Sequence, residues 1–94
     1  MFLICPRKGT RTHTNYTAGG AAIQIALSNR NRKSIVIQNQ GSGVVYVGGA
    51  NVAISGATRG YAIFAGLTFT DNASDGEWWV IAGASQVVHV IEVS

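Results

Sequence analysis

The residues that could carry out chemistry are few and are scattered along the 94-residue chain. The histidines His13 and His89 and the single cysteine Cys5 have no spacing that matches a zinc site. His89 lies among valines near the C-terminal end of the chain, where we expect a packed histidine rather than a ligand. The sequence also lacks a Gly-x-Ser-x-Gly elbow, a Walker loop and a dinucleotide-binding glycine motif. We therefore expect no catalytic residue, no metal, no cofactor and no enzymatic activity.

The densest set of oxygen ligands is the segment 71–77, Asp-Asn-Ala-Ser-Asp-Gly-Glu. A calcium site needs roughly six to eight oxygens, and an EF-hand loop supplies some of them from its third and twelfth positions. Here those positions hold Ala73 and Ala82, so we expect a solvated loop rather than an ion site. A glycosidase needs two carboxylates on opposite sides of a cleft. Three of the four carboxylates lie in this one segment, which argues against a polysaccharide-degrading enzyme.

The charge of the chain is low and is divided along its length. Charged residues make up 12% of the sequence and apolar residues 47%, and this charged share is about half the usual one. All seven cations precede residue 60, and all four carboxylates follow residue 70. Nucleic-acid binders interleave basic clusters with stacking aromatics, a pattern that this chain lacks. We expect contacts with other protein chains instead, including copies of itself. The alternative is a small, glycine-rich β protein with no special partner.

The cysteine count and the apolar segments bear on the compartment. One cysteine cannot form an internal disulfide, which favours synthesis in a reducing cytosol. The apolar start, residues 1–5, lacks the basic region and the length of a signal peptide. No apolar run approaches the length of a membrane span, so we expect no membrane partner.

Strands are the elements that would position any contact residues. Residues 34–38 and 44–47 are rich in β-branched side chains and flank the turn segment 39–43, which predicts a hairpin. Alternating or β-rich segments predict further strands at 21–28, 52–54, 61–64, 67–70, 77–81 and 87–93. About eight short strands at regular spacing, without a convincing helix, are typical of an all-β sandwich or barrel. We predict a single small β-sandwich of two sheets, jelly-roll-like, over residues 21–94.

The alternation also predicts which side chains are buried. We expect the inside of the sandwich to hold Ile35, Ile37, Val45, Val47 and several of Ile63, Phe69, Val80 and Val90. Trp78 and Trp79 are adjacent in a strand and must point to opposite faces. One of them should lie in the core, and the other should be exposed or in a contact. Tyr61, Trp78 and Trp79 are therefore our candidate contact aromatics.

Residues 1–20 show no sustained period, and we assign them to an extended N-terminal arm. Its tip is apolar and is followed by cations, a combination that suits docking on another subunit's surface or sheet edge. A frayed terminus is the alternative. The residues predicted to bind a partner are Phe2, Leu3, Ile4, Arg7, Lys8 and Arg11.

The order of strand and turn motifs resembles a family of small structural proteins of tailed-bacteriophage virions. The shared pattern is a basic Asn-Arg turn, an Ile-x-Ile-x-Asn strand, a Gly-Ser turn and a Val-Tyr-Val-Gly strand. Matching pieces follow at 48–50, 65–66, 67–70, 71–76, 77–82 and 87–93, so the resemblance covers residues 21–94. Ala65-Gly66 replaces the Pro-Gly pair expected of the family.

This resemblance implies a virion structural protein, in its most specific form a capsid decoration or cement protein on the outer head. Such a protein would bind the major capsid protein or another virion protein as a homo-oligomer, such as a trimer, and stabilise the shell. It would be made in the bacterial host cytoplasm and end in the phage particle. A neck, tail or baseplate component is the alternative within this class. A carbohydrate- or receptor-binding module that uses the contact aromatics is the alternative outside it.

Overall fold

The computed structural model describes residues 11–72 and 76–94, and these form eight strands and no helix. The all-β prediction is therefore confirmed. The strands are β1 (Arg11–Ala18), β2 (Ile23–Ala26), β3 (Ser34–Asn39), β4 (Val45–Gly48), β5 (Tyr61–Ile63), β6 (Thr68–Asp71), β7 (Trp78–Ala82) and β8 (Gln86–Val93).

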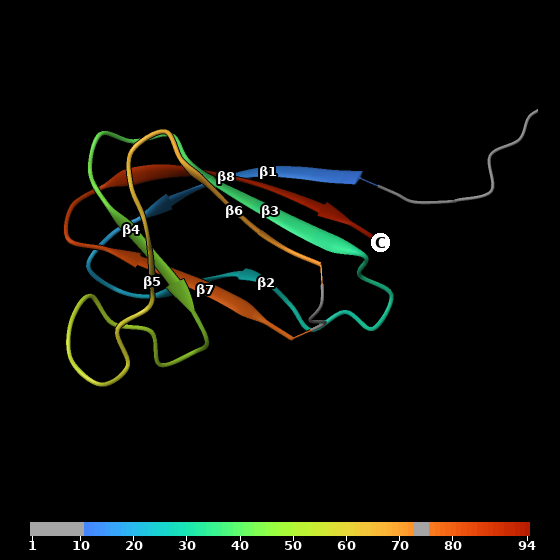
Figure 1. The fold of residues 1–94 in the computed structure, drawn as a ribbon, viewed down its shortest axis with the longest axis horizontal. Coiled ribbons are helices and arrows are strands. Elements are labelled where there is room, and N and C mark those ends of the chain that lie inside the picture. The colour runs from blue at the N-terminus through green and yellow to red at the C-terminus, as the bar shows by residue number, and fades with distance from the viewer. Residues whose placement is uncertain (1–10, 73–75) are drawn as a thin grey trace, which may run out of the picture.

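The strands build two four-stranded antiparallel sheets, in the orders β1-β8-β3-β6 and β2-β7-β4-β5. Figure 1 shows them as an upper and a lower layer that face each other. These strand orders are those of a jelly roll, so the predicted sandwich type is confirmed as well. Each sheet has two edge strands: β1 and β6 in the upper layer, β2 and β5 in the lower.

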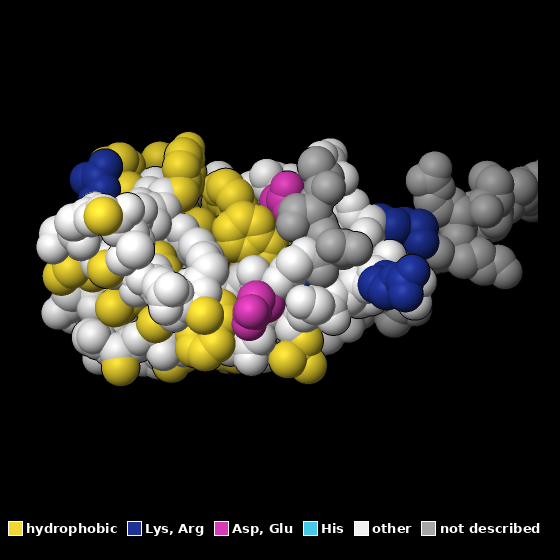
Figure 2. All heavy atoms as spheres, turned by 90° about the horizontal axis from the view of Figure 1, so that it is seen from below, with side chains coloured by type: hydrophobic (Ala, Val, Ile, Leu, Met, Phe, Trp, Pro, Cys, Tyr) yellow, Lys and Arg dark blue, Asp and Glu magenta, His cyan; other side chains and the backbone are white. Residues whose placement is uncertain are grey.

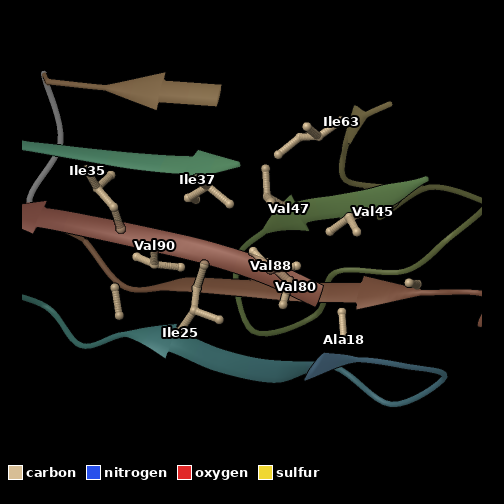
Figure 3. Packing of buried hydrophobic residues seen from close by; sticks show 12 residues of the cluster. Ala18, Ile25, Ile35, Ile37, Val45, Val47, Ile63, Val80, Val88 and Val90 are labelled. Atoms are coloured by element: carbon tan, nitrogen blue, oxygen red, sulfur yellow. The ribbon is translucent and has the colours of Figure 1, made fainter. Parts of the chain in front are cut away.

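The core lies between the two layers and follows the alternation of the strands. Ile35 and Ile37 of β3 and Val45 and Val47 of β4 are buried, while the residues between them are only partly covered. Figure 3 shows these side chains pointing from the two sheets into one shared interior. The predicted core is confirmed, with Phe69 packed against it rather than fully inside.

The hairpin predicted for residues 34–47 is not formed, because its two strands belong to different sheets. β3 pairs with β6 and β8, whereas β4 pairs with β5 and β7. The turn between β3 and β4 therefore crosses from one layer to the other. Each of the two strands has one apolar face, and placing the strands in opposite sheets lets these two faces pack against each other in the core.

The first strand also departs from the sequence analysis, which placed residues 1–20 in an arm. Arg11–Ala18 pair along their full length with β8, from Arg11 opposite Val93 to Ala18 opposite Gln86. Ala18 is completely buried, so this strand belongs to the sandwich. The strand body of the chain therefore begins at residue 11 rather than 21. Residues 1–10, which hold the other predicted arm contacts, lie outside the described residues.

Two smaller differences concern strand ends in the lower layer. The strand predicted at 52–54 is reduced to a single bridge between Ala53 and Arg59. In β2 the register shifts between Gln24 and Ala26, so Ile25 and Ala26 are both buried. The alternation is broken at this shift, and Leu27 beyond it is 71% exposed.

One end of the sandwich is closed by the buried side chain of Asn39, the last residue of β3. Its Nδ2 donates to the carbonyl oxygens of Gly43 at 2.7 Å and Ile63 at 2.8 Å. Its Oδ1 accepts from the backbone N–H of Gly41 at 2.9 Å. The amide thus pairs with backbone groups of the β3–β4 turn and with the last carbonyl of β5. Because β3 and β5 belong to different sheets, this side chain links the two layers.

The opposite end is closed by Arg32, just before β3, whose side chain is fully buried. Its Nε donates to Glu92 Oε2 at 2.6 Å in a salt bridge. Its other nitrogens donate to the carbonyl oxygens of Gly76 at 2.7 Å and Leu27 at 2.6 Å. A basic residue from the first half of the chain and an acidic one from the second half thus meet inside the fold.

We predict that Asn39→Ala lowers the free energy of unfolding by about 2 kcal/mol or more, because it removes the partner of one buried and two partly buried backbone groups, and a buried unsatisfied group costs about 1–3 kcal/mol. Urea unfolding followed by tryptophan fluorescence measures this change. Gln40→Ala is the matched control, since Gln40 is the exposed neighbour, and we expect a change within about 0.5 kcal/mol. Equal losses in the two variants would contradict the role assigned to Asn39.

Candidate docking surface

The register places the predicted contact aromatics on two different faces of the lower sheet. Tyr61 is opposite the buried Val47, and Trp78 lies two residues before the buried Val80, so both point towards the interior. Trp79 points outward, and its Nε1 donates to Glu77 Oε1 at 2.8 Å. The prediction that the tryptophans face opposite sides is confirmed.

The structure joins two of these aromatics through a third, Phe69, which the sequence analysis assigned only to the core. The ring centroids of Tyr61 and Phe69 are 5.2 Å apart, and those of Phe69 and Trp78 are also 5.2 Å apart. Phe69 belongs to the upper layer, where it is opposite Ile37, while the other two rings come from the lower layer. Tyr61, Phe69 and Trp78 thus form an aromatic seam between the two sheets, on the side of β5 and β6.

The outer part of this aromatic seam is uncovered. Tyr61 is 64% exposed, although its position in β5 faces the interior. The turn from β5 to β6 adds Phe64, 57% exposed, and Leu67, 55% exposed. A hollow of about 750 Å³ adjoins Tyr61 and Phe64 on the β5 side. A group of exposed large apolar side chains of this kind is a candidate contact surface.

The turn that presents these apolar residues keeps the geometry of the Pro-Gly turn expected of the resembling family. Leu67 N–H donates to the carbonyl oxygen of Phe64 at 3.0 Å, which closes a four-residue turn. Gly66 has a φ of 78°, as the third position of a type II turn requires. Ala65 occupies the second position, where proline is common but other residues are accepted.

The inner end of the aromatic seam holds an unpaired donor, and the Glu77 side chain beside it is turned to the outward face of the lower sheet, where it binds Trp79. Trp78 Nε1 is buried and has no hydrogen-bond partner among the described residues. Asp71 ends β6 two residues after Phe69, and Glu77 immediately precedes Trp78. Glu77 Oε1 also accepts from Gln24 Nε2 at 2.8 Å. Figure 2 shows hydrophobic side chains gathered on the lower side of the molecule with acidic side chains beside them.

The remaining sequence candidates lie elsewhere. Arg11 is exposed at the start of β1, at the edge of the upper sheet opposite to β6. His89 is half-buried on the outer face of that sheet, where its Nδ1 is 2.6 Å from Asn15 Oδ1 and its ring is 5.9 Å from that of His13. Among the described residues, no three histidine, cysteine or carboxylate side chains are grouped to hold a metal ion.

A second groove, of about 400 Å³, lies between the edge strands β1 and β2. It is lined by Tyr16, Leu27 and Glu92 together with polar residues of the β2–β3 loop. Tyr16 OH donates across it to the carbonyl oxygen of Ile25 at 3.3 Å. The carboxylate that lines this groove, Glu92, is paired with Arg32.

Comparison with known proteins finds a similar fold but no family. No family model and no curated protein matches the chain. A chain from a solved structure of Bacillus endospore appendages, described as a novel family of disulfide-linked pili, is similar with a TM-score of 0.58. The alignment covers 99% of this chain and 96% of that chain at 15% identity, a likeness that extends to the fold alone. The described residues include no helix long and apolar enough to cross a membrane.

We predict different stability costs for two neighbouring rings of the aromatic seam. Phe69→Ala should lower the free energy of unfolding by about 2 kcal/mol or more, because its ring packs on the core. Tyr61→Ala should cost less than about 1 kcal/mol, because most of its ring is in water. Urea unfolding of both variants provides the comparison. A loss for Tyr61→Ala as large as that for Phe69→Ala would show that Tyr61 serves the fold and not a contact.

Proposed function

We propose that this chain is a structural subunit of a bacteriophage virion, which binds other virion proteins and copies of itself. Its most specific form is a capsid decoration protein on the outer head, with a neck, tail or baseplate component as the other position. The observation that carries the proposal is the uncovered aromatic seam, where Tyr61 faces inward yet stays exposed beside Phe64 and Leu67.

Covering this surface would contribute useful free energy. A large apolar side chain gains about 1.5–3 kcal/mol when it is buried completely, and more than half of each of these three remains exposed. The three together therefore offer a few kcal/mol to a partner. A small domain buries a smaller fraction of its surface than a large one, so binding in an assembly can add stability by mass action.

The sheet edges support the same role. β1, β2, β5 and β6 are edge strands, and no described strand pairs with their outer sides. An exposed edge is a template for a strand from another chain. Jelly rolls occur in viral capsid proteins, and the sequence resemblance to phage virion proteins makes the virion the assembly that we favour.

The likeness to endospore pili is in line with a role in assembly, but the cysteine content limits how many copies disulfides could join. One cysteine forms one disulfide, and one disulfide joins two copies only. A polymer linked throughout by disulfides needs at least two cysteines in each copy, whereas these 94 residues contain Cys5 alone. We therefore attribute any assembly of this chain to non-covalent contacts.

A carbohydrate- or receptor-binding module is the second candidate, favoured by one observation. Tyr61 is 64% exposed, and exposed aromatic rings stack on sugars. The rings of the aromatic seam are tilted by 46° and 65°, however, and so provide no common flat platform. Saturable binding of host surface polysaccharide that Tyr61→Ala abolishes would favour this candidate over the structural one.

Truncation of the N-terminal segment tests the structural role. Removing residues 1–10 leaves the whole of β1 in place, whereas a longer deletion would remove part of that strand. We expect the truncated chain to unfold at the same urea concentration but to co-sediment roughly tenfold less with particles that lack the protein, because the apolar tip is lost. Binding of the full chain should also fall as salt rises, since Arg7 and Lys8 contribute.

The two proteins are compared on the same particles, with bovine serum albumin as a control for trapping in the pellet. Equal binding by the full-length and truncated chains would show that residues 1–10 do not attach the protein. Failure of the full-length chain itself to bind any part of the particle would contradict the virion role.

A further inference from the structure

We propose that His13 and His89 together bind a divalent transition-metal ion, of the class that includes Zn²⁺, Ni²⁺ and Cu²⁺. This inference goes beyond the proposed virion role, and it replaces the expectation of no metal, which rested on spacing along the sequence. The chain has two histidines, one in the first described strand and one in the last. The pairing of β1 with β8 brings them together.

The strand register places both histidines on the outer face of the upper sheet. Ala18 and Val90 are buried, so the odd-numbered residues of β1 and β8 point outward. His89 is directly opposite Asn15, and His13 precedes Asn15 by two residues in β1, so the two histidines are diagonal neighbours. Diagonal neighbours lie about 7–8 Å apart in the backbone, within reach of aromatic side chains. The centroids of the two rings are accordingly 5.9 Å apart.

Asn15 fixes which ring nitrogen of His89 is available to a ligand. Nδ1 of His89 lies 2.6 Å from Oδ1 of Asn15. An amide oxygen can only accept a hydrogen bond, so Nδ1 carries the proton and Nε2 of the neutral ring keeps its lone pair. Among the described residues, no group hydrogen-bonds to that Nε2 or to the ring of His13. Histidines that ligate metals usually donate their other ring N–H to an oxygen in this way.

The separation of the two rings suits one shared ion. Two imidazole nitrogens on a tetrahedral ion, each about 2.1 Å from it, place the ring centroids about 5 Å apart. The two rings are 5.9 Å apart and tilted by 45°. His13 is exposed and His89 is half-buried, so a shift of the His13 ring by about 1 Å completes the pair around a fixed His89.

Two neutral imidazoles select the class of ion. Imidazole nitrogen is a preferred ligand of Zn²⁺, Cu²⁺ and Ni²⁺, whereas Mg²⁺ and Ca²⁺ prefer oxygen. Asp71 and Glu92 are both opposite the buried Ile35 and so face inward, which leaves no carboxylate on this face among the described residues. Arg11 shares the face with His13, and its charge opposes any cation. The ion is therefore held by coordination to nitrogen, with its remaining positions open to water.

Calorimetric titration of Zn²⁺ into the full-length chain tests the site, with Cys5→Ser in every protein so that the thiol does not bind zinc. We expect one ion per chain. His13→Gln and His89→Gln should each weaken binding at least roughly tenfold, because the second ligand of a chelating pair acts at a high effective concentration. Glutamine is polar and similar in size, and neither position is in the core, so both variants should unfold at the same urea concentration as the parent.

Asn15 is tested as a positioning residue. Asn15→Ala should weaken zinc binding by about tenfold, because the outer partner of a ligating histidine is lost. Gln38→Ala is the matched control and should leave the affinity unchanged: Gln38 is the amide on the other side of His89, in β3, and its oxygen accepts from Gln40 rather than from the ring. In ¹⁵N NMR spectra of the histidine rings, zinc should shift the Nε2 resonance of His89 while Nδ1 stays protonated.

The contrary outcomes are distinct. Equal affinity for the parent and both histidine variants would show that zinc binds elsewhere and would overturn the site. A loss in only one of the two variants would show a contact with a single histidine and would overturn the shared ion. Zinc bound at Nδ1 of His89, or equal affinity for Asn15→Ala and Gln38→Ala, would overturn the orienting role of Asn15.

Discussion

The buried amide of Asn39 is the contact on which the arrangement of the proposed docking side depends. Its Nδ2 reaches the carbonyl oxygen of Ile63, at the end of β5 in the other sheet. Its own backbone N–H donates to Leu67 at 3.0 Å, and its carbonyl accepts from Gly66 at 2.9 Å. One residue of β3 therefore holds both ends of the β5–β6 turn, which presents the exposed apolar side chains and carries the two edge strands next to the aromatic seam.

Arg32 has the corresponding role at the other end of β3. Its guanidinium binds the carboxylate of Glu92 and the carbonyl oxygens of Leu27 and Gly76, and so ties β8 to two loops. Gly76 precedes β7, which brings Trp78 against Phe69. The central strand thus carries a buried polar group at each end, and the apolar residues between them fill the core. A charged group buried here is compatible with the fold because each of its three nitrogens donates to Glu92 or to a main-chain oxygen.

The alternation of apolar and polar residues was sufficient to predict the strands with one apolar face, such as β3, β4 and β8. The fold class and most of the core followed from these strands. It was insufficient for β1, whose exposed Thr, His and Asn side chains hide a strand that places Tyr16 and Ala18 towards the core. It also failed for the β3–β4 turn, since β3 and β4 pair with strands distant in the sequence and pack their apolar faces against each other, which the turn residues do not reveal. The aromatic seam could be predicted only in part: Tyr61 and Trp78 were candidates, but their link through Phe69 requires two strands that lie in different sheets.

Electron microscopy of purified phage particles with a labelled antibody against this protein tests the virion role most directly. A structural subunit predicts label at regularly repeated positions on the particle, and on the head if the protein is a decoration protein. Particles that carry no label, while the protein is recovered from the soluble fraction of the host lysate, would contradict that role.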